Sequence, residues 1–473
     1  MSRRTAPRAQ PWIIALALVA AVVCASSGTA EARHRASLRA CEGGTPCPPE
    51  VAKLYEQEPT IELVTMGIGE LAWERHGHIA LCVRYHDPAK DVCYNYGIGD
   101  FHHPVQMAWG FFRGAKSFWA GEQQVQELLE IYVGRDRTVW AQPIPLTAEQ
   151  KQQVIEKLQF DILDEHRYYA YDHFWDNCTT RVRDILDNAT GGALKSITDE
   201  TDGKTFRELA RDGFYGLRLF LLVTDLAMGR VTDRVPTYWE RMFLPQYLRE
   251  GVARRWGIQP ILLYERHGPI ASDKQDANGN GIADIHEDAN GNGIPDLEED
   301  ADHNSGRVLF ALFILLVTSP VLLTRWLGRF ERIGLAIAIV PPVILGLVLW
   351  LLAIISPLPY IEWNESCLVF LPLDLALLVL GPDKRRVYAR GRVAMLGLCA
   401  ALHLVGVLTQ PLVAALLWPL IPVAVVGFWK PAWSRKRDEP AAPSAGSSKP
   451  ATASAGKAGS RFASSPTNKP KRR

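Results

Sequence analysis

The sequence has almost no net charge, because its 52 lysines and arginines nearly balance its 51 aspartates and glutamates. A chain without a basic excess lacks the electrostatic footprint of nucleic acid binding, so no nucleic acid partner is expected. The sequence also has no Cys-x-x-Cys pair and no two histidines four residues apart. These spacings are typical of zinc sites, and their absence argues against a catalytic metal centre.

The N-terminus does contain the three parts of a secretory signal peptide. Several arginines within the first eight residues precede an apolar run that ends near Cys24, and "AEA" at residues 30–32 is a cleavage motif. We predict a signal peptide over residues 1–32, with a signal anchor as the alternative, followed by a lead-in over residues 33–60. Export would place the next domain in an oxidising compartment, where disulfides form.

Cysteine arithmetic is informative in such a compartment. Cys82 and Cys93 fall on two predicted strands joined by a turn, where they can face each other. Cys41 and Cys47 are close enough in sequence to close a small loop. If both pairs form, Cys178 is the odd thiol of the exported part. The alternative is that all five are unpaired and buried.

A mixed α+β domain is predicted over residues 61–264. Runs rich in β-branched and aromatic residues, separated by turn residues, predict strands in its first half at residues 61–66, 78–85 and 91–97. The second half has helical signals. Thr147 and Gln150 form a capping box, and a second helix is predicted from Cys178 to the glycines at 191–192.

Residues 273–306 contain the motif D-A-N-G-N-G-I-x-D twice, twelve residues apart. Oxygen ligands at alternating positions around a turn glycine are typical of a calcium loop. No flanking helices of an EF-hand are apparent, so we predict a calcium-stiffened stalk rather than a sensor; a flexible acidic linker is the alternative. The predicted ligands are Asp276, Asn278, Asn280, Ile282, Asp284, Glu287, Asp288, Asn290, Asn292, Ile294, Asp296 and Glu299.

Residues 307–430 predict a membrane domain of five helices. Basic loops alternate with loops that contain no lysine or arginine, which places the stalk outside and the C-terminus in the cytoplasm. Asp374 falls in the third run and is either a functional or helix-pairing residue or an interfacial one. A disordered basic tail is predicted over residues 431–473. The five runs are 308–324, 333–355, 367–380, 393–408 and 412–428.

Cys178 at the start of a predicted helix is a candidate nucleophile. Backbone N–H groups and the dipole at a helix start favour a thiolate. The base would be a histidine brought near in the fold, and "WERHGHIALCV" supplies His76 and His78. His78 begins a predicted strand after a glycine. Asn95, on the neighbouring strand, or Asp100 could orient the ring.

Several segments resemble the periplasmic domain of the Lnb family of bacterial lipoprotein N-acyltransferases. They are "WERHGHIALCV", "CYNYGIGDF", "FFRGAKSFW", "YDHFWDNCTTRVRDIL" and "MFLPQYL", and the resemblance spans residues 61–250. It implies a permuted papain-like (NlpC/LRAT-like) fold in an inner-membrane protein whose catalytic domain is periplasmic. The family usually has an aromatic residue where His76 stands, so His76 competes with His78 as the base, and the calcium stalk resembles an insertion.

The resemblance implies that Cys178 takes an acyl chain from a phospholipid as a thioester and passes it to the amino group of a diacylated lipoprotein. His78 would act as base and acid, and N–H groups at the helix start would stabilise the oxyanion. No cofactor is implied in catalysis. Two rival interpretations remain: a Cys–His hydrolase of lipid esters or peptidoglycan peptides, and a non-enzymatic calcium-dependent scaffold.

Overall fold

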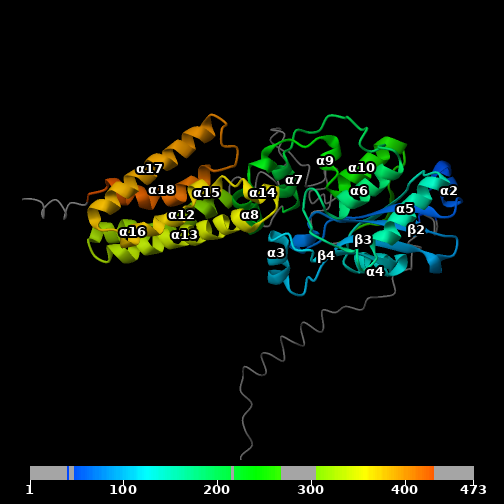
Figure 1. Cartoon of the computed structure of the whole chain (residues 1–473), viewed down its shortest axis with the longest axis horizontal. Helices are drawn as coiled ribbons and strands as arrows, with labels where there is room; N and C mark the ends of the chain where they lie inside the picture. Colours follow the sequence, from blue (N-terminus) through cyan, green and yellow to red (C-terminus); the bar gives the residue numbers. More distant parts are fainter. Residues whose placement is uncertain (1–39, 42–46, 215–217, 268–304, 431–473) are drawn as a thin grey trace, which may run out of the picture. The chain divides into compact units, whose positions relative to one another are not determined.

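The predicted signal peptide and tail, and all twelve predicted calcium ligands, lie outside the residues that the structure describes. Within the described part, the residues up to Trp429 form one compact unit. We call residues 47–267 the sheet domain and residues 305–430 the helical part. The computed structural model in Figure 1 describes residues 40–41, 47–214, 218–267 and 305–430.

The sheet domain is built on one antiparallel sheet, with strand order β6-β4-β3-β2-β1-β5-β7. The three strands predicted from the sequence are present and are neighbours, as hairpin connections favour. An antiparallel sheet with helices on it is the mixed α/β arrangement that the sequence predicted. The strands are β1 Thr60–Met66, β2 His78–Arg84, β3 Val92–Ile98, β4 Phe118–Gln124, β5 Val139–Pro143, β6 Tyr168–Tyr169 and β7 Ile261–Tyr264.

Both faces of the sheet are apolar because helices cover both of them. Successive side chains of a strand point to opposite faces. In β2, Ile79 and Leu81 belong to the cluster that includes residues of α5 and α6, whereas Ala80 and Cys82 belong to the cluster that includes residues of α4 (Figure 1). The sheet is therefore the middle layer of three.

Two helices of the sheet domain, α5 and α6, begin at capping residues that the sequence contains. Thr147 and Gln150 form the predicted capping box of α5, and Asn177 caps α6. The helices are α2 Pro49–Tyr55, α3 Pro104–Phe112, α4 Val125–Gly134, α5 Ala148–Asp161, α6 Cys178–Ala189, α7 Phe206–Gly213, α8 Arg218–Ala227, α9 Tyr238–Arg241 and α10 Pro245–Trp256.

Both expected disulfides are present. Cys41 is bonded to Cys47, and Cys82 is bonded to Cys93 across the β2–β3 ladder, where the two residues are directly opposite. Cys178 is free and buried. The prediction that Cys178 is the odd thiol of the exported part is confirmed.

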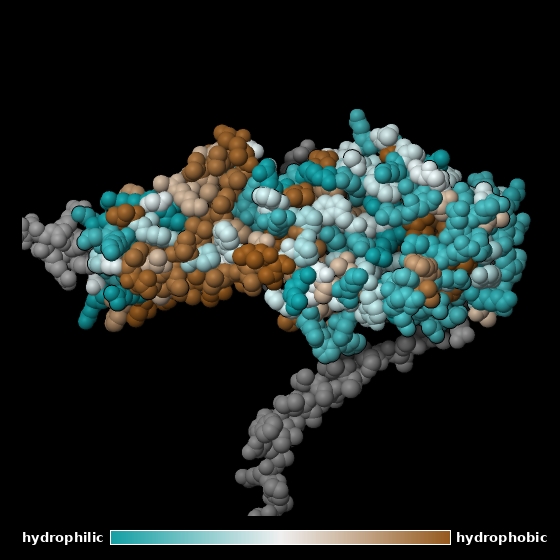
Figure 2. All heavy atoms as spheres, viewed as in Figure 1, coloured by the Kyte–Doolittle hydropathy of each residue, from teal (hydrophilic) through white to brown (hydrophobic). Residues whose placement is uncertain are grey.

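Two helices of the helical part are long and apolar enough to cross a membrane, residues Leu309–Leu327 within α12 and the whole of α13. Figure 2 shows hydrophobic residues gathered over α12 and α13. α18 is apolar but shorter. The helices are α12 Ser305–Leu327, α13 Glu331–Ile355, α14 Pro359–Glu362, α15 Ser366–Val369, α16 Ala376–Val379, α17 Pro382–Leu404 and α18 Val413–Phe428.

The prediction of a third spanning helix over residues 367–380 is wrong. This run forms short helical pieces, interrupted before Pro372, whose ring removes a backbone donor. Asp374 lies buried within it and accepts hydrogen bonds from Arg392 Nε, at 2.9 Å, and from the Tyr388 hydroxyl. It therefore joins the broken segment to α17. The fourth predicted run also begins too late, because α17 includes the basic residues that precede it.

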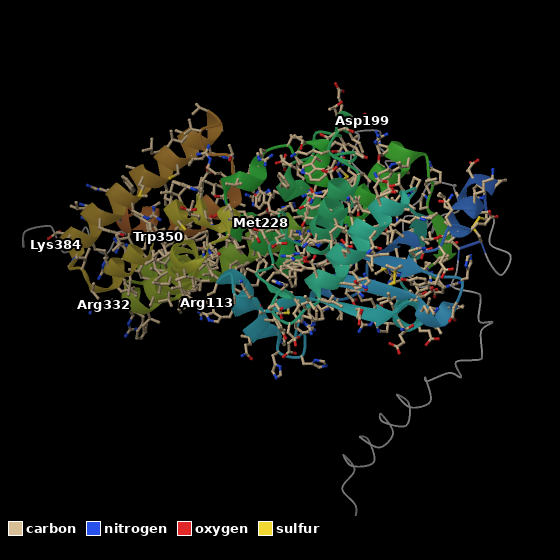
Figure 3. All side chains as sticks on the ribbon, turned by 45° about the vertical axis from the view of Figure 1, so that its right-hand side comes forward. Arg113, Asp199, Met228, Arg332, Trp350 and Lys384 are labelled. Atoms are coloured by element: carbon tan, nitrogen blue, oxygen red, sulfur yellow. A yellow bond between two sulfur atoms is a disulfide. The ribbon has the colours of Figure 1, made fainter. Side chains whose placement is uncertain are left out.

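Contacts divide the loops of the helical part into two groups. Arg325 Nη2 donates to the Trp429 carbonyl, and Arg332 and Lys384 lie at the same end of the helical part in Figure 3. The loops after α13 and α17 contact the sheet domain instead, where Asn364 and Gln410 donate to backbone carbonyls at the end of α8. The basic loops and the loops without basic residues thus lie at opposite ends.

Candidate active site

Cys178 is the first residue of α6, and its position is fixed by the residue before it. The Asn177 side chain accepts hydrogen bonds from the N–H groups of Thr179 and Thr180, both at 2.8 Å. Its amide nitrogen also donates to the Phe243 carbonyl at 2.9 Å. An asparagine cap of this kind fixes the helix start, and the bond to Phe243 holds that start against the rest of the domain.

His78 is the first residue of β2 and is held by Asn95 of β3. The strands pair with Ala80 opposite Asn95, and the buried Asn95 amide oxygen lies 3.2 Å from His78 Nε2. An amide oxygen only accepts hydrogen bonds, so Nε2 must carry the proton. The neutral ring then presents Nδ1 as its basic nitrogen.

The start of α6 lies against the start of β2. The backbone N–H of Ile79, the residue after His78, lies close enough to the Cys178 sulfur to favour its thiolate form. The Tyr132 ring stacks over His78, with ring centroids 6.1 Å apart. Burial raises the pKa of the Tyr132 hydroxyl, the Arg137 cation opposes this, and the nearby Cys178 adds a smaller increase. Among the described residues no hydrogen bond joins Cys178 to His78. Catalytic hydrogen bonds often form only once substrate is bound.

Burial keeps both groups neutral at neutral pH. It lowers the pKa of His78 to about 4, and the nearby Arg137 cation adds to this effect, while the bond to Asn95 opposes it. Burial also raises the pKa of the Cys178 thiol, and outweighs the hydrogen bonds from Thr179 and Ile79. Backbone N–H groups at the helix start favour the thiolate, as expected, but burial outweighs them. Attack by Cys178 requires proton transfer to a base as the bond forms.

His76 lies in a different environment from His78. Its Nε2 is 3.0 Å from the Ala210 carbonyl of α7, and its ring makes edge contacts with His173 and Phe214. A carbonyl also only accepts, so His76 uses its Nε2 proton to hold α7. Of the two histidines, His78 is the one whose strand contacts Cys178.

Asp100 does not orient His78. Its exposed carboxylate lies 2.8 Å from His103 Nδ1 and accepts the His102 N–H. Of the two residues predicted for this role, Asn95 alone contacts the ring. The choice depended on strand register, which places Asn95 beside β2 while Asp100 has already entered the loop after β3.

The N–H groups at the helix start are mostly unavailable for an oxyanion, because Asn177 accepts from Thr179 and Thr180. Sequence reasoning missed a second donor, the Tyr169 hydroxyl, which is buried and has no hydrogen-bond partner among the described residues. Gly97 has φ +78°, and a Cβ built on it would lie 3.7 Å from both the Tyr169 oxygen and Cys178 Cβ. Glycine thus permits close approach here. The tyrosine-rich run before Cys178 was the available signal.

Comparison with protein families finds one match that includes Cys178, His78 and Asn95. The match is to the Lnb N-terminal periplasmic domain, over residues 52–211. It covers less than half of the chain, and no curated protein or solved structure matches. This chain therefore contains a domain similar to the Lnb periplasmic domain. Together with two helices of membrane-spanning length, the Lnb match indicates a membrane-associated protein with a periplasmic domain.

Proposed function

We propose that this protein is a membrane-anchored acyltransferase that transfers an acyl chain from a phospholipid to the N-terminal diacylglyceryl-cysteine of lipoproteins. The observation that carries the proposal is the arrangement of three residues. Cys178 is free and lies at the start of α6, beside the first residues of strand β2. There Asn95 holds His78 so that Nδ1 is the basic nitrogen of the ring. The lipoprotein substrate comes from the resemblance to the Lnb family of lipoprotein N-acyltransferases; residues 52–211 match the N-terminal periplasmic domain of that family.

The reaction has two halves. In the first, Cys178 Sγ attacks the ester carbonyl of the phospholipid while His78 Nδ1 takes the thiol proton. The tetrahedral intermediate then expels the lysophospholipid oxygen, which receives that proton, and leaves a thioester on Cys178. In the second half, the neutral amine of the lipoprotein attacks the thioester and His78 takes a proton from it. The amide forms and the proton returns to the Cys178 sulfur.

Each tetrahedral intermediate carries an oxyanion that needs a donor. We assign this role to the Tyr169 hydroxyl together with the Cys178 N–H. Burial raises the pKa of the Tyr169 hydroxyl well above its usual value, Arg181 opposes the shift, and the Cys178 charge adds to it. A tyrosine that stays protonated is a hydrogen-bond donor throughout the reaction.

Contact with the helical part favours a lipid substrate over a cell-wall peptide. Phe174, four residues before Cys178, packs edge-on against Tyr360 of α14 with ring centroids 5.0 Å apart. Leu352 of α13 and Leu358 belong to the same buried cluster. The segment that leads to Cys178 is thus continuous with the end of a helix long and apolar enough to span a bilayer.

The proposal includes the orientation that the loop charges favour. The basic loops near Arg332 and Lys384 would face the cytoplasm with the C-terminus, and the sheet domain would be periplasmic. α12, α13, α17 and α18 would span the inner membrane, and the broken segment would lie among them. Attachment of a thiol-reactive polyethylene glycol to Lys384→Cys in intact spheroplasts would contradict this orientation; modification only after lysis would support it.

Calcium binding by the stalk remains part of the proposal. The repeats between residues 276 and 299 would bind two ions through carboxylate, amide and carbonyl oxygens and would play no part in the chemistry. Calorimetric titration of the full chain with Ca²⁺ tests this directly. The double variant Asp276→Ala/Asp288→Ala should lose calcium binding. Equal binding by the variant and by the unsubstituted chain would contradict the assignment.

The two halves can be separated with purified full-length protein in detergent. Incubation with phospholipid alone should add one acyl chain to Cys178, detectable by mass spectrometry of the intact chain, and a diacylated lipopeptide should then remove it as an amide. Cys178→Ala should give neither product. Cys367→Ala, which removes another free buried cysteine, is the matched control and should give both. Release of free fatty acid without amide would favour the hydrolase instead.

A further inference from the structure

Helix α3 has an apolar stripe that faces solvent. Val105 and Trp109 are four residues apart, which places them on one side of the helix, whereas Phe112 is half-buried against the cluster that contains Phe174. Val105 is 82% exposed and Trp109 is 44% exposed, and α3 contains no buried residue. A helix of a soluble domain normally turns such a stripe to the core.

A second apolar segment lies beside this helix. Leu71 and Trp73, in the loop between β1 and β2, are 44% and 45% exposed, and Trp73 stacks on Phe101 just before α3, with centroids 5.2 Å apart. We call Leu71, Trp73, Phe101, Val105 and Trp109 the aromatic rim. The rim residues come from two segments, one just before β2 begins at His78 and one just after β3 ends at Ile98. The start of α6, with Cys178, lies at this same edge of the sheet.

The other side of α3 leads to Cys178. Phe111 contacts Tyr171, with ring centroids 6.2 Å apart. Tyr171 and Cys178 lie on the same side of Gly97. A Cβ atom built on Gly97 would be 3.2 Å from the Tyr171 ring and 3.7 Å from Cys178 Cβ. Two aromatic side chains, Phe111 and Tyr171, therefore lead from α3 toward the nucleophile.

The end of α3 also lies at the end of a helix of spanning length. The nearest neighbour of Gly114, two residues after α3, is Pro357, two residues after the end of α13. The opposite end of α13 carries Arg332 (Figure 3). Exposed Arg113 and Lys116 follow α3, and the Arg113 guanidinium lies 5.9 Å from the Trp109 ring centroid. Tryptophan flanked by basic residues at the end of a span is typical of the membrane interface.

We propose that the aromatic rim inserts into the outer leaflet of a phospholipid bilayer, with Val105 and Trp109 among the acyl chains and Arg113 and Lys116 at the lipid phosphates. An acyl chain then enters the path past Phe111 and Tyr171 without crossing water. Insertion does not depend on catalysis, and its place in the outer leaflet follows from the proposed orientation; only the delivery of an acyl chain rests on the proposed transferase activity.

The depth of insertion can be measured without any activity. A nitroxide label is attached to the full chain that carries Val105→Cys, and the labelled protein is reconstituted in nanodiscs of phosphatidylethanolamine and phosphatidylglycerol. The signal of the unsubstituted protein treated with the same label is subtracted as background. Leu163→Cys is the matched control, because Leu163 is also an exposed apolar residue, 46% exposed, and lies just after α5, far from α3 in the sequence. The Val105 label should collide with oxygen, which dissolves in lipid, and be shielded from a water-soluble nickel chelate. The Leu163 label should show the reverse.

Two outcomes would overturn insertion. A Val105 label as accessible to the nickel chelate as the Leu163 label would place the aromatic rim in water. A label shielded from both oxygen and nickel would mean that protein covers α3, either a partner or a second copy of this chain.

A second experiment tests delivery. Val105→Glu/Trp109→Glu should lower acylation of Cys178 by bilayer phospholipid about tenfold, while acylation by a water-soluble short-chain thioester stays unchanged, as should both rates in Leu163→Glu. Equal loss with both donors, or no loss with either, would overturn delivery. If the unsubstituted protein accepts no acyl chain at all, the proposed function fails, and the label depth still decides insertion.

Discussion

The sheet domain and the helical part distribute the same kinds of residue in opposite ways. In the sheet domain, large apolar side chains are mostly buried between the sheet and its helices. In the helical part, Leu316 and Ile354 are more than 70% exposed, while Asp374 and Arg392 are buried. The contrast is the one expected of two solvents, water for one region and lipid for the other. The aromatic rim is an exception within the sheet domain, because it exposes apolar side chains as the helical part does.

The largest expected effect comes from breaking a buried ion pair in each region. Arg84→Met leaves Glu62 and Asp91 without their shared cation, and Arg392→Met leaves Asp374 without its own. Each should cost about 3–5 kcal/mol, because a buried charge remains unpaired. Thermal unfolding of the detergent-solubilised full chain measures both, with exposed Lys90→Met as the control. A shift no larger than that of the control would remove the premise that both regions exclude water.

Replacing an exposed apolar residue by glutamate should have different effects in the two regions. Leu316→Glu should prevent stable insertion of α12, because an acidic residue near the centre of a spanning helix costs about 2.5–3.5 kcal/mol. Leu163→Glu, on the sheet domain, should change stability by no more than about 0.5 kcal/mol. Membrane fractionation and thermal unfolding report the two. If both variants behave alike, the helical part is not in lipid.

Tyr169→Phe probes the site itself. Removal of the hydroxyl should slow Cys178 acylation about a hundredfold, the usual effect of losing one oxyanion donor. Alkylation of Cys178 by iodoacetamide, which passes through no oxyanion, should be unchanged. A parallel fall in both rates would mean that Tyr169 merely supports the fold around Cys178.

Acid should destabilise the sheet domain through its histidines. Burial lowers the pKa of His76 and of His78 to about 4, against about 6.5 in the unfolded chain. Between these values the unfolded chain binds protons that the folded domain does not, so stability falls as the pH drops from about 6.5 to 4. His76→Gln should reduce this slope in the unfolding temperature. An unaltered slope would show that His76 contributes none of it.

The sequence predicted features that depend on local signals. β1, β2 and β3 follow from strand propensity and turn residues, and α6 from the helical run after Cys178 and the glycines that end it. The disulfides followed from the placement of Cys82 and Cys93 on two strands of a hairpin and from the short spacing of Cys41 and Cys47 in an exported domain. Hydrophobic runs also indicated a membrane-associated helical part, because lipid exposure is visible in composition.

Features that depend on distant contacts were missed. The third apolar run contains a proline and an aspartate whose partner is Arg392, eighteen residues away. The choice of His78 over His76 follows from contacts with Asn95 and Ala210. Residue spacing also did not reveal that the Asn177 side chain accepts from the N–H groups of Thr179 and Thr180, two of the N–H groups at the helix start.

The most direct test of the central claim is mass spectrometry of a lipoprotein's N-terminal peptide from living cells. Cells that lack this protein are compared with cells complemented by the unsubstituted chain, by Cys178→Ala and by the control Cys367→Ala. We predict that the third acyl chain appears with the unsubstituted chain and with Cys367→Ala, and is missing from the other two. An N-terminal peptide that is identical in all four would contradict lipoprotein acylation by Cys178.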